Sequence, residues 1–129
     1  MRTIDMLKFS LTLAATWLLV FTSVVQSASV GDTETGIAAY YSNVFHGRRT
    51  ASGERYDKNA YTAAHKRLPF GTRIRIMNLE NGKSVVVKIN DRGPRSKERI
   101  IDVSRRAARD LDFVRKGLTK VRLEVIEVP

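Results

Sequence analysis

The sequence predicts an all-β fold, a small β-barrel with one short helix. Three observations support this prediction. Several short segments alternate polar and apolar residues at a period of two, only one segment has helical spacing, and a long polar stretch at residues 42–60 has no periodicity. The chain of 129 residues has room for one ordinary domain, and it contains no cysteine, so disulfides and thiolate chemistry are excluded.

The clearest strands form a hairpin. Residues 73–77 and 85–89 both alternate polar and apolar side chains, and Asn81-Gly82 between them supplies two residues that tolerate a positive φ. Further strands are expected at residues 35–41, 61–64 and 121–125. The stretch between residues 42 and 60 is long for a loop in a compact domain, and such loops are usually functional.

The single predicted helix begins after Ser104, which can accept a hydrogen bond from the first turn. Ala107, Ala108 and Leu111 follow it at helical spacing. We expect Asp102, just upstream, to orient the helix start and to offset part of the positive charge in the first turn. The basic stretch at residues 95–99 is interpreted as a solvated loop.

Residues 1–27 are predicted to be a signal peptide. Two basic residues, Arg2 and Lys8, precede an apolar run at residues 9–25, and small residues follow. Cleavage is expected before Ala28; cleavage after Ser29 and an uncleaved membrane anchor are the alternatives. The expected domain organisation is a signal peptide at 1–27, a short linker at 28–34 and one domain at 35–129, with no stable membrane insertion after cleavage.

The chain is strongly basic, with 23 Lys and Arg against 13 Asp and Glu, a formal net charge of +10. This charge favours an anionic partner. An exported protein meets envelope polymers and lipid head groups, and no basic run carries the interleaved aromatic residues of a nucleic-acid platform. We therefore expect an anionic cell-wall partner and no nucleic acid.

Asp91 is the most informative polar residue, because it ends an apolar strand and a Gly93-Pro94 turn follows. A partly desolvated carboxyl at a barrel mouth is suited to proton transfer. The alternative is structural: Asp91 pairs with Arg92 or caps the turn.

Glu54 and His65 are weaker candidates, since a loop Glu is often solvated and a lone His is often structural. His46 and His65, nineteen residues apart without cysteine, form a poor metal-ligand pattern. We predict no metal and no cofactor.

Seven short segments of the chain, in order, resemble the rare lipoprotein A (RlpA) family of bacterial lytic transglycosylases. They are GIAAYY at 36–41, FHGR at 45–48, TASGE at 50–54, TAAH at 62–65, LPFGT at 68–72, NDRGP at 90–94 and IDVS at 101–104. The resemblance runs from Gly36 to about Val128 and therefore covers the whole expected domain.

The resemblance implies a six-stranded double-psi β-barrel and peptidoglycan glycan strands as the substrate. It implies endolytic cleavage of the MurNAc–GlcNAc bond with formation of 1,6-anhydromuramyl ends. Asp91 corresponds to the family's catalytic acid, with Glu54 and His65 as further active-site residues. The residues expected to bind substrate are Tyr41, His46, Arg48 and Arg92. We expect Glu54 and His65 to lie near Asp91 across one groove, with residues 42–60 as one wall.

Two features depart from the family pattern: this sequence has no lipobox cysteine and no SPOR domain. We therefore expect an extracytoplasmic protein, periplasmic or secreted, that is monomeric and not lipid-anchored. The main alternative function is a non-catalytic, expansin-like glycan binder, because a fold does not prove an activity. A third is a basic envelope protein that binds lipid head groups or another protein.

Overall fold

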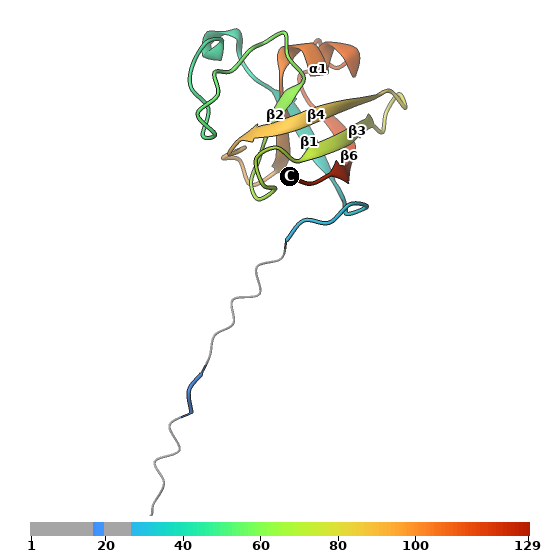
Figure 1. Ribbon diagram of the computed structural model, residues 1–129. Helices are drawn as coiled ribbons and strands as arrows, with labels where there is room; N and C mark the ends of the chain where they lie inside the picture. Colours follow the sequence, from blue (N-terminus) through green and yellow to red (C-terminus); the bar gives the residue numbers. More distant parts are fainter. Residues whose placement is uncertain (1–16, 20–26) are drawn as a thin grey trace, which may run out of the picture.

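The computed structural model describes residues 17–19 and 27–129, and six strands in the second range close into a barrel (Figure 1). The strands are neighbours in the order β1-β5-β2-β4-β3-β6. The predicted all-β fold with one short helix is confirmed. Most of the expected signal peptide lies outside the described residues. No helix in the described part of the chain is long and apolar enough to cross a membrane.

The strands are short and separated by loops of unequal length. Their bounds are β1 (Thr33–Tyr40), β2 (Thr62–His65), β3 (Arg73–Asn78), β4 (Ser84–Asp91), β5 (Arg99–Val103) and β6 (Thr119–Glu127). The long connection between β1 and β2 holds a 3-10 turn, η2 (Asn43–Phe45), and the only α-helix of the described chain is α1 (Arg105–Asp110). All five strands expected from the sequence are present, with ends shifted by at most two residues.

The sixth strand, β5, was not predicted. The sequence indicated a solvated loop through Arg99, which is the first residue of β5. Ile100 is an extra residue in the pairing of β5 with β1, because Ile37 pairs with Arg99 and Ala38 with Ile101. Because the extra residue of this β-bulge precedes the buried Ile101, two isoleucines are adjacent in the sequence. The alternation of polar and apolar residues that indicates a strand is therefore lost.

The barrel interior is a continuous apolar core. In β3, Ile74 and Ile76 are fully buried while Arg73 and Arg75 are exposed, as the period of two requires. β3 pairs with β4 in antiparallel register, and the predicted Asn81-Gly82 turn connects them. The core side chains come from every strand, from α1 and from the residues just after it: Ala38, Ala63, Ile74, Ile76, Val87, Ile89, Ile101, Val103, Ala107, Ala108, Leu111, Phe113, Val121, Leu123 and Val125.

Helix α1 begins as predicted. The Ser104 hydroxyl oxygen accepts a hydrogen bond from the Ala107 N–H at 3.2 Å, and the hydroxyl donates to the Ala60 carbonyl at 2.6 Å. Ala107 and Ala108 are buried against the barrel. The cap therefore also attaches the end of the long β1–β2 loop to the helix.

A second bulge lies in β4. Ala63 of β2 pairs with Ile89, whereas Ala64 pairs with Asp91, so Asn90 is the extra residue. Ile89 points into the core, and the bulge turns Asp91 to the outer face, which it shares with Ala64. Asp102 of β5 also faces outward, by regular alternation between the buried Ile101 and Val103, and it pairs with Ala39 of β1.

Candidate active site

A cavity of about 810 Å³ opens on the outer face of the barrel wall formed by β1, β5, β2 and β4. Four residues in lateral register cross its floor: Ala39, Asp102, Ala64 and Asp91, one from each strand. Adjacent strands lie about 4.8 Å apart, so the backbones of the two aspartates are about 10 Å apart. The floor thus consists of two alanines and two carboxylates. The full lining is Ala39, Tyr40, Tyr41, Ser42, Phe45, Arg48, Arg49, Ala64, Asp91, Arg92, Gly93, Pro94, Arg95, Arg99 and Asp102.

Three donors hold the Asp91 carboxylate. The Tyr41 hydroxyl donates to Oδ2, and the backbone N–H groups of Ala51 and Arg92 donate to Oδ1 at 2.8 and 2.9 Å. The Arg92 guanidinium does not pair with Asp91 in the described chain, whereas the bond from the Arg92 N–H is a local contact of the kind that the turn-capping alternative expects. Asp91 therefore lies in the cavity with a fixed orientation.

Tyr41 links Asp91 to an aromatic cluster in the β1–β2 loop. Its ring lies 4.3 Å from that of Tyr56 and 6.1 Å from that of Phe45, between centroids. Burial, followed by the hydrogen bond to Asp91, raises the pKa of Tyr41 far above its ordinary value of 10. The Tyr41 hydroxyl therefore keeps its proton and acts as a donor to Asp91.

Asp102 is a site residue that the sequence did not reveal. Its Oδ1 accepts a hydrogen bond from Arg99 Nε at 3.2 Å, and its side chain lines the cavity. The expectation that Asp102 orients the helix start is therefore replaced by a place in the cavity. Burial raises the pKa of Asp102 above its ordinary value, and the Arg99 guanidinium opposes that rise. One signal was available: a carboxylate between two buried residues of a strand lies on the opposite face from the core.

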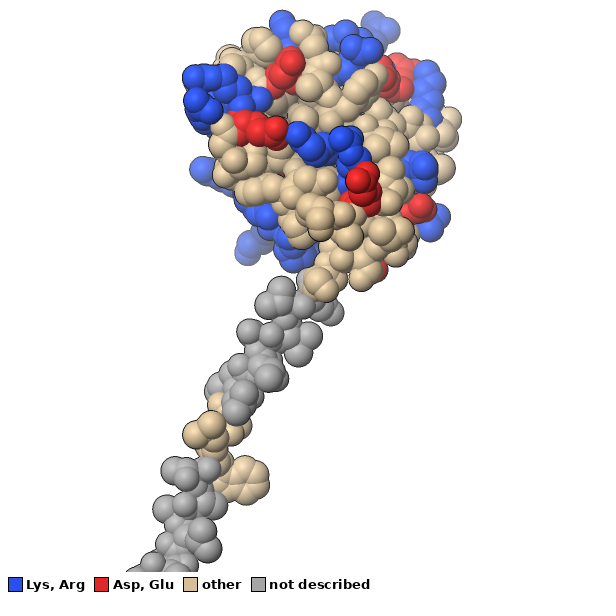
Figure 2. Space-filling view, viewed as in Figure 1, with Lys and Arg blue, Asp and Glu red and all other residues tan. Residues whose placement is uncertain are grey.

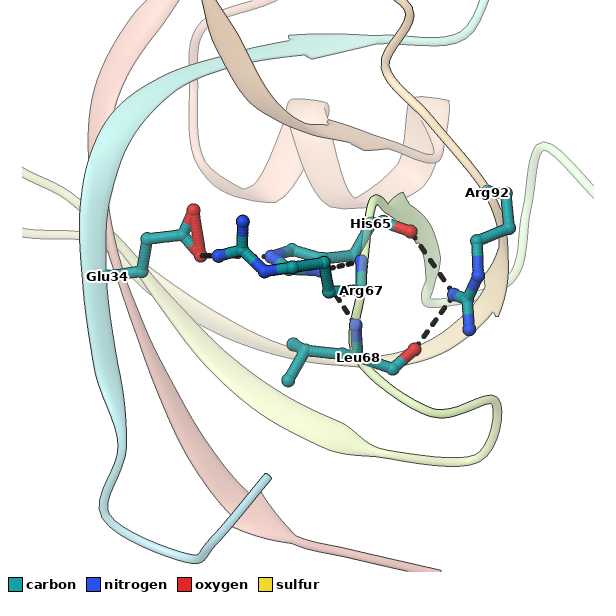
Figure 3. A network of polar contacts seen from close by, with 5 residues as sticks. All are labelled: Glu34, His65, Arg67, Leu68 and Arg92. Atoms are coloured by element: carbon teal, nitrogen blue, oxygen red, sulfur yellow. Dashed lines mark hydrogen bonds and ion pairs between the residues drawn. The ribbon is translucent and has the colours of Figure 1, made fainter. Parts of the chain in front are cut away.

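His65 is not among the residues that line this cavity, and its ring lies between Glu34 and the turn at Arg67 and Leu68 (Figure 3). It is buried, and Nε2 lies 3.0 Å from Glu34 Oε2. Nδ1 accepts hydrogen bonds from the backbone N–H groups of Arg67 and Leu68, both at 3.0 Å. Because Nδ1 is an acceptor, the ring is neutral and carries its proton on Nε2. Burial also lowers the pKa of His65 below its ordinary value.

His65 and Glu34 instead line a second cavity, of about 700 Å³. The connection to Asp91 runs through Arg92. The Arg92 guanidinium donates to the carbonyls of His65 and Leu68 at 3.2 and 2.8 Å, and it lies 4.1 Å from the centroid of the Phe70 ring (Figure 3). His65 thus fixes the turn that holds Arg92, the neighbour of Asp91.

Glu54 lies at the edge of the β1–β2 loop, outside the cavity lining. Its Oε2 accepts a hydrogen bond from Lys88 Nζ at 2.9 Å, and this bond lowers the pKa of Glu54. The Glu54 carbonyl accepts a hydrogen bond from the Thr50 N–H at 2.7 Å, one residue before Ala51. Glu54 therefore attaches to β4 the loop segment that supplies a donor to Asp91.

Of the other predicted residues, Arg48 lines the cavity with its guanidinium 5.2 Å from the Phe45 ring centroid. His46 does not line it, and its Nδ1 accepts a hydrogen bond from the Lys58 N–H at 3.2 Å. The structure thus brings together Tyr41, Arg48, Asp91 and Arg92. The predicted loop wall is confirmed, since Ser42, Phe45, Arg48 and Arg49 all line the cavity.

Several lining residues were not singled out from the sequence, namely Phe45, Arg49, Arg95 and Arg99. They come from loops or from the unpredicted strand β5, where no periodicity indicates direction. Among the described residues, no group of three or more His, Asp or Glu side chains is placed to hold a metal ion.

The family model described as lytic transglycolase matches residues 33–123. The chain belongs to the lytic transglycolase family. This confirms the resemblance to RlpA proteins and the double-psi β-barrel.

Among curated members of the lytic transglycolase family, the endolytic peptidoglycan transglycosylase RlpA of Neisseria meningitidis is 55% identical over 94 residues, which are 73% of this chain and 39% of that protein. The RlpA of Campylobacter jejuni is 50% identical over 76% of this chain and 36% of its own length. The chain thus spans little more than a third of the length of these relatives.

Solved structures share the fold at low sequence identity. The Streptomyces papain inhibitor is 19% identical, with a TM-score of 0.65, over 78% of this chain and all of that one. An expansin of Clavibacter michiganensis is 19% identical, with a TM-score of 0.61, over 76% of this chain and 52% of that one. The fold is therefore shared by proteins with different names and functions.

Proposed function

We propose that this domain is an endolytic peptidoglycan lytic transglycosylase that cleaves the MurNAc–GlcNAc bond and leaves 1,6-anhydromuramyl ends. One observation carries the proposal: a carboxyl group, Asp91, is held by Tyr41 and Ala51 in an open cavity beside a second carboxyl, Asp102. The names of the curated RlpA relatives support the same substrate and reaction.

The reaction needs one group that first gives and then takes a proton. Asp91 donates a proton to the glycosidic oxygen, and the bond between that oxygen and C1 of the muramic acid breaks. The C6 hydroxyl oxygen of the same sugar bonds to C1, and its proton returns to Asp91. No water is consumed, so the second carboxylate of a hydrolase, which attacks or activates water, is not required.

Asp102 has a different role in the proposal. Positive charge develops on the sugar ring in an oxocarbenium-like transition state, and a carboxyl across Ala64 from Asp91 lies where it can stabilise that charge. The Arg99 ion pair favours the ionised form of Asp102. Tyr41 orients Asp91, so that the carboxyl keeps one geometry through both proton transfers.

His65 and Glu54 act as positioning residues in this proposal. His65 organises the turn whose carbonyls hold the Arg92 guanidinium, and the Arg92 N–H donates to Asp91. Glu54 attaches the Ala51 segment to Lys88 of β4. Both residues therefore act on Asp91 through the surrounding structure. For Arg48, we retain substrate contact at the loop wall as part of the proposal, whereas His46 lies outside the cavity lining and holds the loop through its hydrogen bond from the Lys58 N–H.

The proposed substrate places the domain outside the cytoplasm, with residues 1–27 removed on export and the mature protein a monomer free of a lipid anchor. N-terminal sequencing of the exported protein is expected to begin at Ala28. A protein that begins at Met1 contradicts the signal peptide, and mass spectrometry of the same sample tests for an attached lipid.

The decisive experiment is Asp91→Asn, assayed on purified sacculi by chromatography of the released products. Asn is nearly isosteric but cannot donate the proton, so anhydromuramyl products should fall by about 10²–10⁴-fold, with sacculus binding retained. The matched control is Asp112→Asn, at an exposed position whose φ of 57° suits Asn. Cutting by folded Asp91→Asn at the wild-type rate removes Asp91 as the acid. A wild type that binds sacculi and never cuts them establishes a glycan binder.

A further inference from the structure

The charges around the cavity are not balanced. Five arginines and two aspartates line it. One arginine, Arg99, pairs with Asp102, whereas Asp91 is held by a hydroxyl and two backbone N–H groups. Within the described residues, Arg48, Arg49, Arg92 and Arg95 form no ion pair. Cations gathered in one cavity repel one another, and an anionic ligand would relieve that repulsion.

These four arginines differ in how far their donors are already used. The Arg92 guanidinium is bound to two carbonyls and stacked on Phe70. Arg49 Nη1 donates to the Gly53 carbonyl at 2.8 Å. Arg48 is supported only by the face of Phe45, and no hydrogen bond to another described residue holds the Arg95 side chain. Arg48 and Arg95 are exposed, so both keep their planar forks of N–H donors available.

Arg48 and Arg95 also come from two different loops that line the cavity. Arg48 belongs to the β1–β2 loop, and Arg95 follows the Gly93-Pro94 turn after Asp91. Basic side chains are widespread elsewhere, as Figure 2 shows for one face of the molecule. What distinguishes this pair is its place on the cavity that holds Asp91.

A guanidinium fork fits a carboxylate through two parallel hydrogen bonds. Neutral sugar hydroxyls do not require such a partner. In peptidoglycan, the muramic acid bears a lactyl ether whose carboxyl is free when the stem peptide is absent and amide-linked when it is present. The stem peptide has carboxylates of its own.

We propose that Arg48 and Arg95 form a carboxylate-binding subsite that recognises the acid-bearing substituent of muramic acid. The inference rests on the proposed function, because that function supplies the sugar. The subsite distinguishes muramic acid from N-acetylglucosamine, which lacks the substituent, and so sets which of the two alternating sugars lies next to Asp91.

The test measures binding rather than cutting. Titration calorimetry compares three oligosaccharides of equal length: a peptide-free GlcNAc–MurNAc oligomer, the same oligomer with stem peptides, and a neutral chitooligosaccharide. The double variant Arg48→Gln/Arg95→Gln should bind the acidic oligomers about tenfold or more weakly than wild type and the chitooligosaccharide equally well. The matched control, Arg109→Gln/Arg122→Gln, loses the same charge from exposed positions away from the cavity and should change acidic binding less than twofold.

The pattern of loss identifies the carboxylate. A loss confined to the peptide-free oligomer assigns the lactyl group, and a loss confined to the peptide-bearing oligomer assigns the stem. The variant Arg48→Lys/Arg95→Lys keeps the charge without the fork and should give an intermediate loss. Equal affinities of wild type and the Gln variant, or equal losses on all three ligands, overturn the proposal.

Failure of the subsite and failure of the proposed function give different results. A wild type that leaves sacculi uncut but shows the arginine-dependent preference retains the subsite and loses the catalytic assignment. A wild type that cuts sacculi without any arginine-dependent preference loses only the subsite. Thermal melting of each variant confirms that the barrel is folded.

Discussion

Asp91 and Asp102 lie in one lateral row of the barrel wall, with Ala64 of the intervening strand β2 between them. Their environments differ. Asp91 is held by Tyr41 and by two backbone donors, whereas Asp102 is half-buried and paired with Arg99. Carboxyl pairs in unlike environments are a recurrent feature of acid–base sites, and the four predictions below follow from these contacts.

Asp102→Asn should reduce activity and should not destabilise the domain at neutral pH. Its folded pKa lies above the unfolded value of 3.8, so the folded state takes up the proton first as the pH falls. Ionising Asp102 therefore costs stability above its folded pKa, and Asn removes that cost. We expect the variant to form anhydromuramyl products at a roughly 10²-fold lower rate than wild type. We also expect its Tm at neutral pH to equal or exceed that of wild type, and the difference in Tm to shrink toward pH 4. A variant that melts lower at pH 7 and cuts normally shows that Asp102 is structural.

Tyr41→Phe should lower kcat without weakening sacculus binding. Phe keeps the ring packed against Tyr56 but removes the donor to Asp91 Oδ2. A hydrogen bond to a charged group contributes about 1.5–3 kcal/mol, which corresponds to a loss of about tenfold or more. Tyr40→Phe is the matched control, because the Tyr40 hydroxyl donates to the Val114 carbonyl, away from Asp91. Equal rates for the two variants would show that the Tyr41 hydroxyl does not position the acid.

The stability of the domain should fall on acidification because of His65. The folded pKa lies below the unfolded value of 6.5, so the unfolded chain binds the proton first. The stabilisation from neutral His65 is complete above pH 6.5 and is lost as the pH falls through the folded value. Chemical denaturation across this range should show a decline in wild type that is absent in His65→Asn and retained in His46→Asn. A pH slope unchanged in His65→Asn assigns the decline to other groups.

Glu54→Gln and Lys88→Gln should reduce activity by similar amounts, and the double variant should lose no more than either single variant. The reason is that the pair works as one unit, which attaches the Ala51 segment to β4. The pair is half exposed, so each change in Tm should reflect less than about 1 kcal/mol. A much larger activity loss in Glu54→Gln alone would mean that Glu54 acts on the substrate directly.

The barrel is well predicted from the sequence because residues that alternate between polar and apolar at a period of two are alternately exposed and buried in a strand. The hairpin of β3 and β4, the closing strand β6 and the Ser104 cap follow from local pattern. Strand β5 was not predicted because its bulge at Ile100 interrupts that pattern. Register across strands is a nonlocal property, which is why the pairing of Asp102 with Ala64 is not visible in the linear chain.

The site was predicted less completely for the same reason. Asp91 was found because it ends an apolar strand next to a turn. Resemblance supplied His65 and Glu54 without the direction of their side chains, and the structure places the His65 ring with Glu34 rather than in the Asp91 cavity. Side-chain direction depends on strand parity, and a bulge within β4 changes that parity between Ile89 and Asp91.

The bulge in β4 is a single additional residue, Asn90, so the direction of the Asp91 carboxyl depends on how the strand pairs as well as on which residues it contains. If β4 kept its length but paired without the bulge, Asp91 would follow the buried Ile89 by two residues in regular alternation and would point to the interior, although every side chain of the site remained encoded. The cavity that holds Asp91 therefore depends on a local irregularity of backbone pairing as well as on the side chains that line it.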